Sequence, residues 1–139
     1  MAVAFKAEFL YYVVGSGSFL HSFFSTIAYR LESKEWGSVY PILMKQLYDS
    51  KVESESLPEL RNEVVRVREE LKLFPPTDII WDFDDLSKQP PWGDNISPEI
   101  TSLSNYFVSS EGKDLFNLIL MAIDEATEAG ITLEITEFP

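Results

Sequence analysis

Four aspartates around a proline-rich turn are the residues whose type and spacing best suit chemistry. Asp82, Asp84 and Asp85 stand almost side by side, and Asp94 follows the turn. Carboxylates at such short spacing can bind Mg²⁺ or Ca²⁺, or can divide acid and base roles when their pKa values differ. The pattern lacks the regular ligand positions, central glycine and closing glutamate of an EF-hand loop. We therefore favour a solvated acidic edge, and a metal-dependent hydrolase that uses these four aspartates is the alternative.

His21 is the only histidine, and the sequence contains no cysteine. The absence of cysteine excludes disulfides, thiolate zinc sites and cysteine nucleophiles. Ser22 cannot form a catalytic pair with His21, because adjacent side chains on a helix diverge. We interpret His21 as a partly buried structural histidine that hydrogen-bonds to the acidic half of the chain. The sequence thus predicts no catalytic, cofactor-binding or metal-ligating residues.

Trp92 lies in the loop between Pro91 and Gly93 and has two interpretations. It anchors an interface with a partner, or it folds over the edge of the sheet. Negative charge beside an exposed aromatic ring is typical of a surface that meets a basic protein. We therefore predict a partner-binding surface made of one aromatic and four acidic side chains: Asp82, Asp84, Asp85, Trp92 and Asp94.

The charge of the chain is large and unevenly distributed. The 139 residues carry a formal net charge of -12, from 11 basic and 23 acidic side chains. Residues 75–139 hold two basic and thirteen acidic side chains, a net charge of -11. This balance argues against nucleic acid and against an anionic membrane as ligands, because both need clustered cations. The same field attracts a basic protein and accelerates its encounter.

The length and hydropathy of the chain predict one domain over residues 1–139. No apolar run approaches the roughly 20 residues that cross a bilayer, and Lys6 and Glu8 interrupt any signal peptide. The cytoplasm is the default location. We expect a monomer or a weak homodimer, which would associate through the neutral N-terminal half.

Hydrophobic periodicity and capping residues predict the elements that position these side chains. The predicted strands cover residues 3–14, 79–84 and 131–138, and the predicted helices cover 19–31, 38–48 with Pro41 in its first turn, 57–74, 97–103 and 113–129, the last closed by Gly130. We therefore predict a two-layer α+β fold. Its small, mostly antiparallel sheet has about three strands, with four to five helices on one face. The open face would carry Lys6, Glu8, Asp82, Asp84, Thr132 and Glu134.

Several segments resemble the immunity protein 70 family. They are residues 19–29 (FLHSFFSTIAY), 36–37 (WG), 40–41 (YP), 43–45 (LMK), 86–97 (LSKQPPWGDNIS) and 103–116 (LSNYFVSSEGKDLF). The resemblance covers nearly the whole chain, and residues 81–97 are its most specific part.

The resemblance implies a small bacterial protein that protects cells from a polymorphic toxin encoded beside it. Such a protein is not an enzyme. It binds its cognate toxin domain in the cytoplasm, and it blocks the toxin's active site or prevents its activation. Many of these toxins are nucleases with basic clefts, so an acidic surface can take the place of the phosphate backbone. The resemblance supplies no catalytic residues to transfer.

Overall fold

The structure, a computed structural model, describes residues 2–138. Its strands are β1 (Ala2–Ala7), β2 (Leu10–Ser16), β3 (Lys51–Val52) and β4 (Leu133–Phe138). Its α-helices are α1 (Gly17–Arg30), α2 (Leu57–Leu71) and α3 (Leu115–Ala129). Shorter helical segments are η1 (Ile42–Leu47), η2 (Ser54–Ser56) and η3 (Pro76–Asp78). Within the described residues, no helix is both long enough and apolar enough to cross a bilayer.

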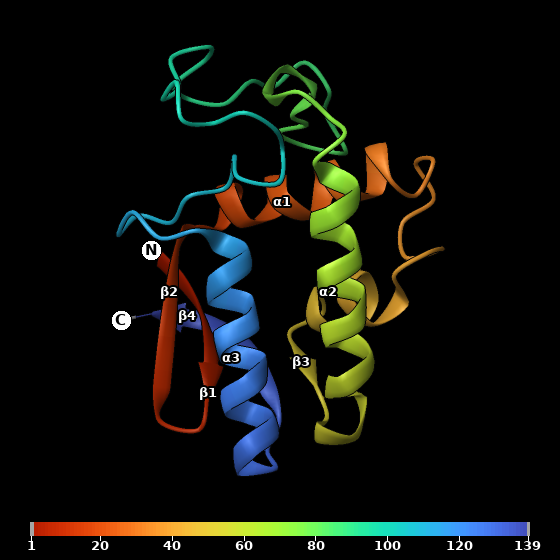
Figure 1. Cartoon of the computed structure of the whole chain (residues 1–139), viewed down its shortest axis with the longest axis vertical. Helices are drawn as coiled ribbons and strands as arrows, with labels where there is room; N and C mark the ends of the chain where they lie inside the picture. The colour runs from red at the N-terminus through yellow and green to blue at the C-terminus, as the bar shows by residue number, and fades with distance from the viewer. Residues whose placement is uncertain (1, 139) are drawn as a thin grey trace.

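The four strands form one antiparallel sheet in the order β2-β1-β4-β3. One face carries buried Phe5 and Ala7 on β1 and Leu133 on β4, and α3 packs against β1 and β2. Lys6 and its cross-strand neighbour Glu134 point to the opposite face. Figure 1 shows α2 and α3 side by side, with α1 crossing above them. The predicted α+β fold is confirmed, with four strands instead of about three.

The prediction of one strand over residues 3–14 is wrong, because this segment is a β-hairpin. Ala7 pairs with Leu10, which leaves Glu8 and Phe9 as a two-residue turn. Glu8 has a φ of 59° and Phe9 is 87% exposed. A positive φ at the first turn position is usually supplied by glycine. Because glutamate stands there and the apolar alternation runs through the turn, no turn signal is visible in the sequence.

The three α-helices confirm the predicted ones to within a few residues. The Ser16 hydroxyl caps α1 by accepting the Phe19 N–H at 3.1 Å, and the Asp114 carboxylate caps α3 by accepting the Asn117 N–H at 3.2 Å. Gly130 ends α3 with a φ of 68°. The buried stripe of α2 has the apolar spacing that predicted it: Leu57, Leu60, Val64, Val67 and Leu71.

Two other helical predictions need correction. Residues 42–47 are helical, but with the wider turn of a π-helix, η1. Residues 97–103 form turns and no helix, because side chains satisfy their backbone groups. The Asn105 carbonyl oxygen accepts the N–H groups of Thr101 and Ser102, and its amide donates to the Glu99 carbonyl. Such local side-chain bonds compete with helix formation.

Two buried carboxylates fix the segment between α1 and η1. Glu32, 2% exposed, accepts the N–H groups of Gly37, Val39 and Tyr40. Glu63 on α2 accepts the N–H of Leu43 at 2.8 Å, and burial raises the pKa of its carboxyl group. These bonds replace the regular partners that the backbone of residues 37–43 lacks.

A candidate partner-binding surface

The segment predicted as a strand over residues 79–84 is not a strand, because side chains of α1 take its backbone hydrogen bonds. The hydroxyls of Ser22 and Thr26 both donate to the Ile80 carbonyl, at 2.8 and 3.1 Å. Thr26 also accepts the Ile80 N–H at 3.1 Å, and Ser25 accepts the Phe83 N–H at 3.0 Å. Consequently Asp82 and Asp84 lie in a loop held against α1, outside the sheet whose open face they were expected to share.

Replacing Thr26 with valine is expected to lower the free energy of unfolding by about 1–3 kcal/mol. Valine preserves the shape of this fully buried side chain but leaves the Ile80 N–H without its acceptor. Thr127→Val is the matched control, since the exposed Thr127 hydroxyl only donates to the Ile123 carbonyl within α3. Urea unfolding measures both variants, and equal stability of the two would contradict the role of Thr26.

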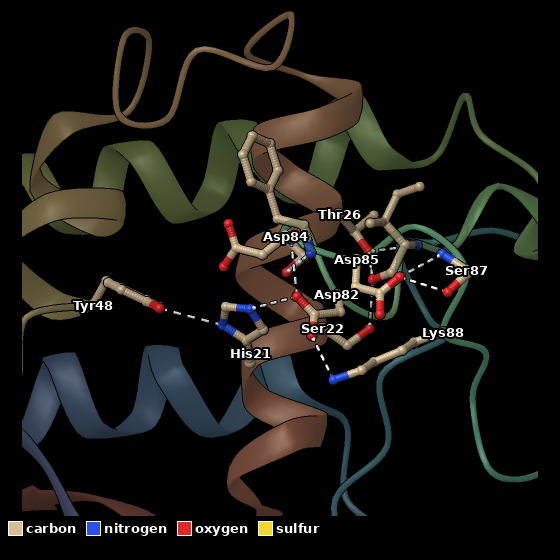
Figure 2. Close-up of polar contacts among 12 residues, drawn as sticks. His21, Ser22, Thr26, Tyr48, Asp82, Asp84, Asp85, Ser87 and Lys88 are labelled. Carbon is tan, nitrogen blue, oxygen red and sulfur yellow. Dashed lines mark hydrogen bonds and ion pairs between the residues drawn. The ribbon is translucent and has the colours of Figure 1, made fainter.

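Asp82 is the most connected of the predicted site residues, as Figure 2 shows. Its Oδ1 atom accepts the Asp84 N–H at 2.9 Å and lies 3.5 Å from His21 Nε2, while Oδ2 lies 3.3 Å from Lys88 Nζ. The bond from the Asp84 N–H, supported by Lys88 and His21, holds the pKa of Asp82 below its ordinary value. His21 is partly buried and its Nε2 atom lies 3.5 Å from the Asp82 carboxylate, so it lies against the acidic half of the chain, and its structural role stays a prediction.

The four aspartates of the hydrolase alternative do not form one cluster. His21, Asp82 and Asp84 can each place a ligand atom within 4.8 Å of the others, and in the described chain this group includes neither Asp85 nor Asp94. The Asp85 carboxylate accepts hydrogen bonds from the hydroxyl and the N–H of Ser87. Both bonds lower the pKa of Asp85, and the bond from the hydroxyl has the larger effect. Asp94 instead lines a separate hollow beside Tyr106.

Trp92 is packed by its edges and still partly exposed. Its indole N–H donates to the Tyr106 hydroxyl at 2.9 Å, and its ring meets Trp81 edge to face at 5.4 Å. The side chain is 38% exposed. The ring therefore packs on Trp81 and Tyr106, which lie outside the strands and not at the sheet edge that one interpretation expected, and the residue stays partly exposed. Its role in partner binding stays a prediction.

An aromatic hollow lies beside the loop of residues 78–97, which we call the acidic loop, and the sequence analysis did not predict it. Trp36 packs edge to face on Tyr48 and on Phe83, with ring centroids 4.8 and 5.3 Å apart. The His21 ring stacks on Trp36 with a centroid distance of 6.2 Å. These rings line an open hollow of about 450 Å³ whose other lining residues include Asp84. The rings come from four separate segments, so no local spacing could have predicted their meeting.

The hollow lies in a negative field. The pKa of Tyr48 is raised first by burial and then by the charges of Asp84 and Asp82. The Tyr48 hydroxyl also lies 3.3 Å from His21 Nδ1. The His21 ring therefore lies between Tyr48 and Asp82 and contacts both (Figure 2). A cation entering the hollow would therefore meet favourable electrostatic potential.

One comparison with known proteins gives a match. The family model described as Immunity protein 70 matches residues 5–135, nearly the whole chain. No match is found among curated proteins or among solved structures. The matched range contains α1, the acidic loop and every ring of the hollow.

Proposed function

The chain belongs to the immunity protein 70 family, and from this premise we propose that it binds and neutralises a cognate toxin domain of a bacterial polymorphic toxin system. The protein acts by binding and not by catalysis. The two meet in the cytoplasm, with the immunity protein as a monomer or weak homodimer. Its partner is a basic toxin domain such as that of a nuclease, and neither nucleic acid nor a membrane is its ligand.

The observation that carries the mechanism is the charge of the loop held on α1. The acidic loop contains five aspartates and one lysine. Asp84, Asp85 and Asp94 are exposed there, and Trp92 offers a partly exposed ring. We assign the toxin-facing surface to these four residues and Asp82. The surface occludes the toxin's active site by occupying a basic cleft.

Calorimetric titration with the toxin domain encoded immediately upstream tests this proposal. The expected result is a one-to-one complex whose affinity falls steeply between about 50 and about 300 mM NaCl, since salt screens exposed charges. Absence of binding at the lower salt would overturn the proposed function. Equal affinity at both salt concentrations would overturn the acidic mechanism alone and move the interface to apolar residues.

The metal-dependent hydrolase remains the second candidate, because His21, Asp82 and Asp84 can converge on one ion. We expect Mg²⁺, Mn²⁺ and Ca²⁺ to leave the thermal unfolding midpoint unchanged, since Lys88 already pairs with Asp82. Specific binding to the folded state would raise the midpoint. A saturable rise that Asp82→Asn abolishes and Asp94→Asn preserves would contradict the expectation, because Asp94 lies outside the group.

A further inference from the structure

We propose that the aromatic hollow lined by Trp36, Tyr48, Phe83 and His21, with Asp84 beside them, receives an arginine side chain of the toxin domain. This inference rests on the proposed function, because the arginine belongs to the proposed partner. It extends the toxin-facing surface from the acidic loop to α1 and η1, and it names the chemistry that the surface recognises.

The walls of the hollow are held in place before any partner arrives. The Trp36 indole N–H donates to the Met44 carbonyl of η1 at 2.7 Å, which fixes the plane of the ring. Phe83 is held through its backbone N–H by Ser25 of α1. Tyr48 is 43% exposed and packs edge to face against Trp36, which makes it the remaining aromatic wall of the hollow. A preorganised aromatic wall binds a side chain without first losing conformational entropy of its own.

The charges at the hollow favour a cation. Asp84 and Asp49 are exposed lining residues, and each contributes a carboxylate to the hollow. Lys45 is the one cation among the lining residues, and its aliphatic stem lies over Gly37, where an added Cβ would come within 2.5 Å of it. The lining of the hollow therefore contains two carboxylates and one ammonium group, and the stem of the lysine is already packed.

Arginine satisfies both features of the hollow at once. Its planar guanidinium stacks on aromatic faces and is less strongly hydrated than the ammonium of lysine. Its remaining N–H groups can pair with the Asp84 carboxylate in a charge-assisted bond. An apolar side chain in the same place would bury that carboxylate without a partner, which is costly. A guanidinium also fits easily within about 450 Å³.

Titration of the full ¹⁵N-labelled chain with N-acetyl-arginine methylamide tests the hollow without the toxin. The expected result is a saturable shift of the Trp36 indole N–H signal, which a Trp36→Phe variant identifies. N-acetyl-citrulline methylamide has nearly the same shape but no charge, and it should cause little shift. Equal shifts with both compounds, or none with the arginine compound, would overturn the proposal.

Variants locate the binding and connect it to the toxin. Tyr48→Ala and Asp84→Asn are each expected to lower the affinity for the arginine probe and the affinity for the toxin domain. The affinity for the toxin domain should fall by about tenfold or more. Tyr11→Ala is the matched control, since Tyr11 is 42% exposed on the open face of the sheet. Unchanged toxin affinity in both hollow variants would overturn the inference and leave the proposed function standing. A wild-type chain that binds the probe but no toxin would overturn the proposed function and the identity of the partner, and would support only a cation site.

Discussion

Replacing Glu32 with alanine is expected to lower the free energy of unfolding by about 3 kcal/mol, the largest loss of stability that we expect from any single substitution described above. The Glu32 carboxylate accepts the N–H of Gly37 at 2.8 Å and those of Val39 and Tyr40 at 2.9 Å. Alanine leaves these three donors without their acceptor, and the bonds from Gly37 and Tyr40 are buried while that from Val39 is partly buried. The same segment carries Trp36, so the wall of the hollow should loosen as well.

Glu35→Ala is the matched control for this prediction. Glu35 has the same charge and is exposed only three residues away, so its removal should change the stability by no more than about 0.5 kcal/mol. Glu32→Gln should fall between the two, since an amide can accept through one atom only. Urea unfolding followed by circular dichroism gives the three values. A Glu32→Ala variant as stable as Glu35→Ala would contradict the role of the buried carboxylate.

Reversing the charge of Asp84, Asp85 and Asp94 to lysine together is expected to weaken toxin binding by about a hundredfold or more. The change removes three exposed negative charges from the acidic loop and adds three positive ones. Both the steering of a basic partner and the contacts with it are then lost. Calorimetry at low salt measures the loss of affinity. Most of this loss should come from a lower association rate constant.

A triple variant of equal charge separates a local effect from a general one. Glu128 at the end of α3 and Glu134 and Glu137 on β4 are exposed and lie outside the acidic loop. Reversing these three to lysine changes the net charge by the same amount. We expect this control to lose far less affinity than the first triple variant. Equal losses would show that net charge alone matters, and an unchanged affinity in the first variant would place the interface elsewhere.

The helices and the closing strand could be predicted from sequence because their signals are local. The apolar stripes of α1, α2 and α3 and the Gly130 cap each lie within the element that they define. The segment over residues 79–84 misled the same reasoning. Its apolar alternation is typical of a strand, yet its partners are hydroxyls on α1, more than fifty residues away in sequence.

The candidate site was predictable only in its acidic part. The clustering of Asp82, Asp84 and Asp85 is visible in the sequence, and His21, expected to contact the acidic half, lies 3.5 Å from Asp82. The meeting of Trp36 with Tyr48 and Phe83 depends on tertiary packing. A tryptophan beside Gly37 was the one available signal, and it does not reveal which rings surround it.

Survival of cells that express the toxin domain shows whether this chain neutralises that toxin. The toxin domain encoded immediately upstream is induced with this chain, with the Asp84, Asp85 and Asp94 triple variant, or with an empty vector. We expect growth with the wild-type chain, and little or none with the triple variant or with the vector. If cells died equally with the wild-type chain and with the empty vector, the chain would not be an immunity protein for this toxin.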